Sequence, residues 1–469
     1  MKNKNERKEL KMPHTFIILF VFIVAMSLLS YVVPAGEYER IQMDGRDVVN
    51  PDSFAILEKT PVTLMGLLSA VPRGFVESGD IIILTLCVGA AVAVLQAIGV
   101  IPVAIEKLAN KFSNKSILII PLLMFIFSLS DAFIGVNEMT LVYVPIILPL
   151  MIRLGFDSMT ACAIALCGSA AGFSAALTNP FTIAIGQKIS GLPLYSGWQF
   201  RVITYAVTLV IGVIYTIKYA KKVQNNITKS YVYEEDIEKR ELYGNKSDGK
   251  QLEFTTKQKY AGISAIILLI VTLVGVIAFK WDMFEMSGMF ITIGVVSGLI
   301  GGFSGNEVCD NLLKGCGDML MGGIIIGIAR GISVVMRQAN ISDTIVHFFA
   351  NMLGNIPGIF VAIGILFVVT IMNFLIPSGS GKAVILFPIL APLADVVGVT
   401  RQTAVLAYQF GDGFSNIVYP SSGYFMACIA NAGVPWKKWV KFFMPLLIIW
   451  TIEAAIFLII AQTIGFGPF

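Results

Sequence analysis

Charged side chains within apolar stretches are the residues of this chain best suited to chemistry. Glu138, Lys382 and Asp412 all lie in such stretches. A charge at the centre of a bilayer costs about 2.5 to 3.5 kcal/mol on insertion scales, so such residues usually serve a function. Lys382 can pair with a ligand carboxylate or with Asp412, and Glu138 and Asp412 can receive an amine, a coupling ion or a proton. Two acids against one lysine favour a ligand that carries positive charge as well as a carboxylate, and a salt bridge among the three residues is the structural alternative.

Small polar residues surround these charges in the sequence. Helix ends present unpaired N–H groups with partial positive charge, which bind carboxylates, and nearby hydroxyls and amides complete such a site. The alternative for these groups is hydrogen bonding between helices. The predicted substrate-binding residues are Asn137, Glu138, Ser174, Thr178, Asn179, Ser378, Gly379, Ser380, Gly381, Lys382, Asp412, Ser415, Asn416, Ser421 and Ser422.

Other intramembrane polar residues are weaker candidates. Asp131 precedes the first group of polar residues, and Arg330 is the lone arginine of an apolar helix, where it can hold an acidic partner or gate a path. Asp80 and Asp318 occupy matching positions at expected helix starts, where capping and the helix dipole explain an aspartate.

The sequence favours no catalytic or metal chemistry. The GxxxxGK[ST] phosphate-binding loop is missing, and Ser378–Ala383 resembles it only superficially. The six cysteines lack metal-ligand spacing. We therefore predict that the protein is not an enzyme and has no catalytic residues, metal or cofactor, with Na⁺ or H⁺ possible as a coupling ion. The net charge of +4 mostly reflects cytoplasmic loops and indicates no nucleic-acid partner.

The composition predicts that the solvent of most of the chain is a lipid bilayer. Hydrophobic residues make up 56% of the 469 residues and charged residues 14%, against roughly 25% charged in soluble domains. Apolar segments of about 20 residues, long enough to span a bilayer as helices, recur along the chain. The segment 16–33 is expected to be a retained first helix. Basic clusters in the N-terminal tail and at 107–115, 218–222, 257–259 and 437–441 predict a multi-pass protein of the cytoplasmic membrane with a cytoplasmic N-terminus.

The two halves of the chain resemble each other. Five matches occur in the same order, at offsets between 238 and 243 residues. The number of spans before the first match differs by one between the halves, so equivalent segments should cross in opposite directions, as in alternating-access carriers. The matches pair 78–80 with 316–318, 109–110 with 350–351, Asn114 with Asn355, 144–160 with 387–403, and 172–180 with 413–420.

Two segments in each half do not fit simple spans. Residues 116–153 and 358–397 have two apolar arms around a polar tip, which predicts re-entrant hairpins. Residues 157–190 and 401–430 are interrupted by polar stretches, which predicts broken helices. Irregular backbone at membrane depth is tolerated where it lines a wet cavity, so these breaks indicate the site. We expect an all-α fold with a first inverted repeat at 1–222, a cytoplasmic linker at 223–257 and a second inverted repeat at 258–469.

A family resemblance covers almost the whole chain. The opening "MPHTFIILFVF…YVVPAGEYER", the tip "IPSGSGKA" and the segment "GDGFSNIVYPSSGYFMA" resemble YfcC-type carriers, which are grouped with DcuC-type four-carbon dicarboxylate carriers and are distantly similar to AbgT-type carriers. The resemblance implies the ion-transporter superfamily fold with scaffold and transport domains, a homodimer and an elevator motion.

The predicted function is secondary transport of a small carboxylate-bearing solute. The charge balance favours an amino acid, with a basic amino acid as one candidate, moved by uptake or exchange. A four-carbon dicarboxylate is the alternative within this class, and an ion channel is the alternative from another class.

Overall fold

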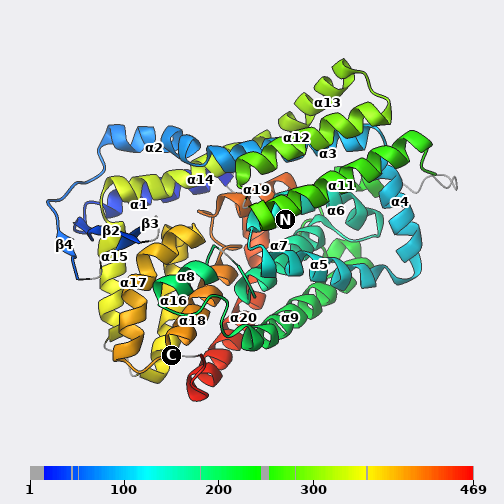
Figure 1. Cartoon of the computed structure of the whole chain (residues 1–469). Coiled ribbons are helices and arrows are strands. Elements are labelled where there is room, and N and C mark those ends of the chain that lie inside the picture. The colour runs from blue at the N-terminus through cyan, green and yellow to red at the C-terminus, as the bar shows by residue number, and fades with distance from the viewer. Residues whose placement is uncertain are drawn as a thin grey trace, which may run out of the picture.

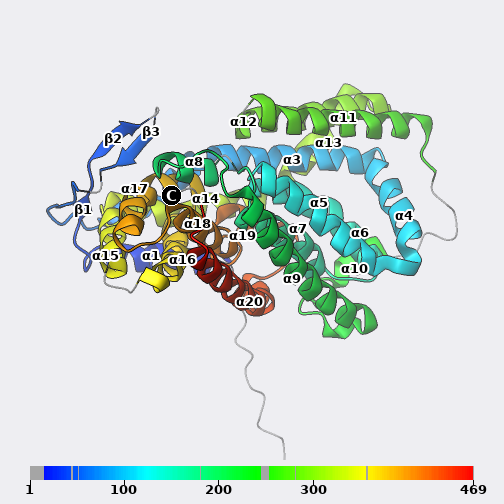
Figure 2. The ribbon, with the colours of Figure 1, turned by 60° about the horizontal axis from the view of Figure 1, so that its bottom comes forward.

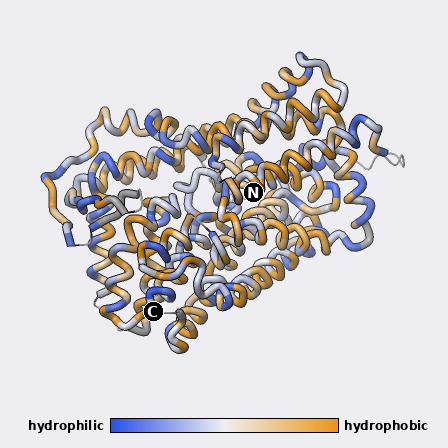
Figure 3. The backbone as a smooth tube through the Cα atoms, viewed as in Figure 1, coloured by the Kyte–Doolittle hydropathy of each residue, from blue (hydrophilic) through white to orange (hydrophobic). Residues whose placement is uncertain are grey.

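Helices make up nearly all of the regular structure. The computed structural model describes residues 15–43, 46–50, 52–179, 181–244, 253–279, 281–354 and 358–467. Within these ranges, eight helices are long and apolar enough to cross a membrane. Figure 3 shows hydrophobic residues along the length of the long helices. The chain is therefore a multi-pass membrane protein.

The first half of the chain begins with a helix, two short antiparallel ribbons and a series of helices. Strand β1 pairs with β4, and β2 pairs with β3. The elements are α1 (Thr15–Leu29), β1 (Gly36–Glu37), β2 (Arg40–Met43), β3 (Arg46–Val49), β4 (Ala55–Ile56), α2 (Leu64–Glu77), α3 (Gly79–Ala97), α4 (Val100–Phe112), η1 (Ser113–Leu118), α5 (Ile119–Phe133), η2 (Asn137–Met139), α6 (Thr140–Arg153), α7 (Ser158–Ser174), α8 (Ile183–Ile189) and α9 (Trp198–Asn225).

The second half repeats much of this order of elements. Helices α13, α14 and α15 have 14, 19 and 13 residues, as do α2, α3 and α4, and α9 and α20 both have 28. The elements are η3 (Ile227–Lys229), α10 (Ile237–Gly244), α11 (Thr256–Phe279), α12 (Met283–Gly301), α13 (Gly305–Asp318), α14 (Leu320–Gln338), α15 (Ser342–Gly354), α16 (Gly358–Leu375), α17 (Gly379–Val396), α18 (Arg401–Ser415), α19 (Gly423–Asn431) and α20 (Trp436–Thr463).

These lengths fit a duplicated chain. Asn355 and Pro180, which belong to two of the matched segments, lie outside the described residues. The inverted orientation of the halves, the re-entry of the hairpins and the elevator motion remain predictions.

Helices α3, α12 and α13 pack together on one side of the molecule, next to α11, and α2 packs against α14. Figures 1 and 2 show α11, α12 and α3 running along this side, while the ribbons lie at the opposite end with α15 and α17. The cavity described below lies where the α2–α3 and α14 segments meet the interrupted helices.

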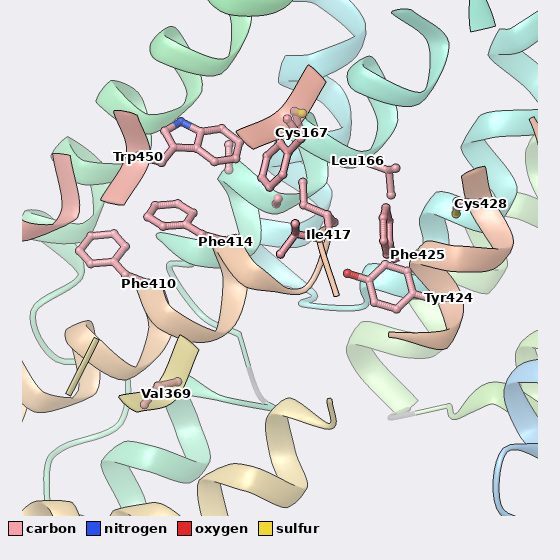
Figure 4. Packing of buried hydrophobic residues seen from close by; sticks show 14 of the residues in the cluster. Leu166, Cys167, Val369, Phe410, Phe414, Ile417, Tyr424, Phe425, Cys428 and Trp450 are labelled. Carbon is pink, nitrogen blue, oxygen red and sulfur yellow. The ribbon is translucent and has the colours of Figure 1, made fainter. Parts of the chain in front are cut away.

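The interrupted helices form the interior. Every residue of α7 is buried, as is every residue of α18 after Arg401. Large aromatic side chains fill the space around them: the Phe414 and Trp450 ring centroids lie 5.1 Å apart (Figure 4). The chain leaves helical conformation between α7 and α8 and again between α18 and α19. Both interruptions fall inside the segments that the sequence predicted to be broken.

The linker between the halves is docked where the structure describes it. The Asp236 carboxylate is fully buried and accepts a hydrogen bond from the Ser158 backbone N–H at 2.7 Å, at the first turn of α7. Lys438 at the start of α20 forms a salt bridge with Glu235 at 2.6 Å. These contacts tie the beginning of the linker to both halves. Linker residues 245–252 lie outside the described residues.

Candidate substrate cavity

A cavity of about 310 Å³ lies where four irregular segments meet. Its lining includes residues from the tips of both hairpins, at 135–138 and 377–380, and from both helix interruptions, at 181–182 and 421–422. Helices α2, α3 and α14 close the remaining side with Glu77, Asp80, Ile326 and Arg330, among others. Residues as far apart as Glu77 and Tyr424 thus share one small space.

The predicted binding residues divide into two sets. One set lines the cavity, and the other lies behind it and supports the tips and interruptions. The lining set is Asn137, Glu138, Ser378, Gly379, Ser380, Asn416, Ser421 and Ser422. The residues outside the lining are Ser174, Thr178, Asn179, Gly381, Lys382, Asp412 and Ser415.

Lys382 forms a fully buried salt bridge behind the second tip. Its Nζ lies 2.6 Å from Asp412 Oδ1 and donates a hydrogen bond of 2.6 Å to Asn373 Oδ1. The Asn373 amide in turn donates to the Asp412 carbonyl, to Ser415 Oγ and to Asn416 Oδ1, at 2.8 to 3.0 Å. The salt-bridge alternative raised for Lys382 is therefore the arrangement in this structure, and the network holds Asn416 at the cavity wall.

The tip of the second hairpin lies against α18. A Cβ on Gly379 would stand 2.7 Å from Asp412 Oδ2, so only glycine allows this approach. The Tyr408 hydroxyl donates a hydrogen bond of 2.6 Å to the Gly379 carbonyl. Ser378 caps α17 by accepting from the Gly381 N–H at 3.2 Å. Gly379 and Ser380 begin this helix and line the cavity, and the first N–H groups of a helix lack intrahelical partners.

The first tip is held by the first helix interruption. Gly135 has φ of +70°, and a Cβ there would lie 2.3 to 2.5 Å from the Asn179 side chain. Asn179 Oδ1 accepts from the Phe181 N–H at 2.8 Å, and Thr178 donates to the Phe133 carbonyl at 3.3 Å. Ser174 donates to the Ala170 carbonyl within its own helix. These three predicted residues, Asn179, Thr178 and Ser174, shape the wall from behind.

The charges in the lining differ from those that the sequence suggested. Three carboxylates, Glu77, Asp80 and Glu138, and one guanidinium, Arg330, line the cavity. Arg330 Nε lies 3.4 Å from Glu77 Oε2, and Arg337 also pairs with Glu77. Within the described residues, Asp80 and Glu138 form no salt bridge. The formal charge of the lining is therefore negative, and Asp80 and Glu138 carry it.

The helix-start explanation holds in part for Asp80, which lies in the first turn of α3, and is wrong for Asp318. Asp80 lies in the first turn of α3, but its carboxylate accepts only from the next N–H, that of Ile81, at 2.8 Å. Asp318 is the last residue of α13 and is exposed, so it does not begin a helix. Asp80 instead faces the cavity, because α2 and α3 follow each other with only Ser78 between them.

Several polar groups at the cavity have no partner. The buried hydroxyls of Thr182 and Ser421 make no hydrogen bond within the described structure. The Ser422 side chain makes no capping bond to the first turn of α19, and the first N–H groups of a helix lack intrahelical partners. Buried polar groups are rarely left unsatisfied in folded proteins, so these groups are suited to a polar ligand.

Sequence reasoning missed part of the lining. Thr182 follows the first predicted break closely, and Tyr424 follows the second, so a wider window around each break includes them. Asp80 has an intramembrane charge, the same signal that identified Glu138, but its position near a helix start suggested a cap. Glu77 carries no comparable signal, since its partner Arg330 is 253 residues away in the sequence and only the fold brings the two together.

Comparison with known proteins adds the family. The family model described as "DcuC: C4-dicarboxylate anaerobic carrier" matches residues 12–463. The chain is 33% identical to an Escherichia coli K12 protein named "Putative basic amino acid antiporter YfcC", and the alignment covers 97% of each chain. This relative covers the full length of the fold described above.

Two solved transporter structures are similar to this one. The Alcanivorax borkumensis YdaH transporter matches with a TM-score of 0.42 and 16% identity, over 97% of this chain and all of that one. MtrF of Neisseria gonorrhoeae, whose structure is described as illuminating a class of antimetabolite efflux pumps, matches with a TM-score of 0.42 and 18% identity, over 96% and 95% of the two chains.

The match of the family model over nearly the whole length, together with the E. coli relative, identifies the protein class: this chain belongs to the DcuC family of anaerobic C4-dicarboxylate carriers and is a membrane transporter.

Proposed function

We propose that this carrier moves a basic amino acid across the cytoplasmic membrane, by uptake or exchange, and binds it in the cavity between the two hairpin tips. The observation that carries the proposal is the charge of the lining, which holds the carboxylates of Glu77, Asp80 and Glu138 against the single guanidinium of Arg330, itself paired with Glu77. A carboxylate without a counter-charge is less stable in a protein cavity than in water, so a cationic ligand would stabilise both Asp80 and Glu138.

The opposite pole of the cavity suits a carboxylate. The N-termini of α17 and α19 reach the lining at Ser378–Ser380 and Ser422–Tyr424. Helix N-termini offer N–H donors and a favourable dipole to an anion, and the unpartnered Ser421 hydroxyl lies beside the second of them. A ligand with a carboxylate at one end and a cationic group on a flexible chain would satisfy both poles.

The role of the charges differs from that expected from the sequence. Lys382 and Asp412 neutralise each other behind the wall, and so neither supplies the net charge of the cavity. Asp80, and not Asp412, is then the second acid beside Glu138 that receives the cationic group of the solute. The preference for a cationic solute therefore has a different basis from the one inferred from the sequence. The printed name of the E. coli relative, a basic amino acid antiporter, agrees with this preference.

Counterflow in proteoliposomes tests the proposal. Vesicles are loaded with unlabelled arginine, ornithine, lysine, a neutral amino acid, succinate or fumarate, and uptake of the same labelled solute is followed. We expect transient accumulation with the basic amino acids. Glu138→Gln and Asp80→Asn should each raise the half-saturating concentration of a basic amino acid about tenfold, the effect of losing roughly 1.4 kcal/mol of binding energy. Accumulation of succinate or fumarate alone would contradict the proposal.

A four-carbon dicarboxylate is the second candidate. The family description supports it, as do Arg330 and the two helix N-termini, all of which suit anionic groups. This candidate requires Asp80 and Glu138 to be protonated when the solute binds. It predicts that neutralising them leaves succinate counterflow intact or improves it, which is the reverse of the effect expected for a basic amino acid.

We further propose an architecture for the transport cycle. The recurring helix lengths and the paired hairpins support two inverted repeats, with the hairpins re-entering the bilayer from opposite faces. A transport domain containing the interrupted helices would then move against a scaffold of α2, α3 and α11–α14 within a homodimer, in an elevator motion. The N-terminus would lie in the cytoplasm. Crosslinking of the purified protein would test the dimer, and labelling of single cysteines from each side of the membrane would test the orientation.

A further inference from the structure

Asp131 is a buried acid that the proposed substrate site does not use. It lies on α5, two residues before the helix ends at Phe133, and is 1% exposed. Neither carboxylate oxygen makes a hydrogen bond within the described structure. The polar groups beside it are the Ser169 hydroxyl of α7 and the backbone N–H of Val136. Within the described residues, this buried acid forms no salt bridge.

The matching position in the second hairpin is occupied by a neutral residue. Asn373 lies two residues before the end of α16 at Leu375. Its amide makes four hydrogen bonds, one of which it accepts from the Lys382 ammonium. The second hairpin therefore holds a permanent cation and a fully bonded amide where the first hairpin holds only an acid. If a cation bound reversibly to Asp131, the first hairpin would have the same pairing of charges as the second.

The burial of Asp131 limits how its carboxylate can be neutralised. An ionised carboxylate in a dry interior without a partner is unfavourable by several kcal/mol, so it binds a cation or a proton. The titratable groups that face it are Glu138 of η2, Tyr143 of α6 and Tyr424 of α19. All are acidic, so none of them is a counter-charge for an ionised Asp131.

Asp131 is connected directly to the cavity wall. Its carbonyl accepts from the Gly135 N–H at 3.0 Å, and Gly135 begins the lining of the first tip. The next carbonyl, that of Ala132, accepts from the N–H groups of Leu177 and Thr178 at 2.8 and 3.2 Å, in the first helix interruption. A change of charge on Asp131 thus acts on the turn that joins the tip to the interruption.

We propose that Asp131 carries the coupling proton of this transporter. The carboxylate takes one proton from water on one side of the membrane and releases it on the other during each cycle, and no other bond is made or broken. The proposal rests on the proposed function, because it assigns a driving ion to the same cavity. The first hairpin is then the ion-binding hairpin, and the second, with its internal Lys382, needs no ion.

The experiment separates solute exchange from proton coupling in proteoliposomes. Counterflow of labelled arginine reports exchange, and net uptake driven by an imposed pH gradient reports coupling. For the wild type we expect both, with net uptake severalfold faster under the gradient. The Asn side chain of Asp131→Asn has nearly the shape of a protonated aspartate but cannot release a proton. We expect its counterflow rate to stay within about threefold of the wild-type rate. The stimulation of its net uptake by the pH gradient should be at least tenfold smaller than in the wild type.

Glu453→Gln is the matched control. Glu453 is another buried acid in a spanning helix, with one oxygen bonded to Thr208 at 2.8 Å and the other unpartnered, but it lies outside the cavity lining. This variant should keep the response to the gradient. Should Asp131→Asn fail to give a monodisperse protein, Asp131→Glu takes its place: it should keep coupling but shift the pH at which net uptake is half-maximal.

The outcomes are distinguishable. If wild-type protein shows no counterflow with any basic amino acid, the proposed function fails. The coupling proposal is overturned, with the function intact, if counterflow persists and Asp131→Asn still responds to the pH gradient. It is equally overturned if Asp131→Glu leaves the pH profile unchanged, or if wild-type net uptake follows a sodium gradient and ignores a pH gradient.

Discussion

The two hairpin tips occupy corresponding places in the chain but solve the same electrostatic problem differently. In the second, Lys382 is neutralised by Asp412 and anchored by Asn373 inside the protein, although Asp412 Oδ2 makes no hydrogen bond within the described structure. In the first, Asp131 has no partner, and Glu138 faces the cavity without one. The second tip contains its own counter-charge, whereas the acids of the first tip are available to a ligand or ion that binds from outside the protein.

This difference indicates that the two tips have separate roles. A buried pair rigidifies its surroundings, because separating the charges in a dry interior is costly. An unpaired acid does the opposite, since its best state depends on what is bound to it. We therefore expect removal of the charges at the second tip to lower stability, and removal of the acids at the first tip to change what is bound or moved.

The largest expected effect comes from breaking the buried pair. Lys382→Met leaves Asp412 charged and unpartnered, which should lower the free energy of unfolding by about 3 to 5 kcal/mol. Thermal unfolding of the detergent-purified protein measures this as a lower midpoint. The double variant with Asp412→Asn should recover much of the loss, because it removes the orphaned charge. Unfolding of the single variant at the wild-type temperature would argue against the pair.

The second comparison places a methyl group on a glycine at each tip. Gly135→Ala must adopt φ of +70° and meets Asn179, whereas Gly379→Ala keeps ordinary helical backbone and meets Asp412 and Thr182. Overpacking costs about 1 to 3 kcal/mol, and left-handed backbone adds about 1 to 2 kcal/mol. Gly135→Ala should therefore unfold at the lower temperature, and equal midpoints would show that Asn179 moves aside.

The third variant replaces the acid of the first tip with the neutral residue found at the matching position of the second tip. Glu138 and Ser380 are 242 residues apart, the same separation as Asp131 and Asn373. Glu138→Ser should raise the half-saturating concentration for arginine counterflow about tenfold, with little change in thermal midpoint. Its control is Ser380→Ala, which removes a hydroxyl but no charge. This control should change the half-saturating concentration for arginine less. Similar effects of the two substitutions would place the charge preference elsewhere.

The smallest effect is expected at the far ends of the hairpins. Arg401 and Asp395 form a salt bridge of 2.6 Å at the end of α17, with side chains 34% and 47% exposed, whereas Arg153 and Glu106 at the end of α6 are 13% and 12% exposed. Asp395→Asn should cost under about 1 kcal/mol, with the loss shrinking further at high salt. Glu106→Gln should cost more and depend less on salt, and the reverse order in thermal midpoints would contradict this assignment.

Sequence patterns predicted the elements better than the site. Apolar runs, interrupted by Asn, Pro and Ser, located the hairpin tips and the helix interruptions, because their physical causes are local. The pairing of Lys382 with Asp412 was raised as an alternative but not decided, since it depends on how α17 packs on α18. The predicted helix start at Asp80 is present, but no local pattern showed that the fold also places this residue in the cavity lining. The docking of Asp236 against α7 left no signal in the linker sequence.

Direct binding tests the central claim most simply. Isothermal titration of the purified protein with arginine and with succinate, on the wild type and on the Asp80→Asn, Glu138→Gln double variant, needs neither vesicles nor a gradient. The account predicts that the wild type binds arginine and that the double variant binds it at least tenfold more weakly. Binding of succinate but not arginine by the wild type, or unchanged arginine affinity in the double variant, would contradict it.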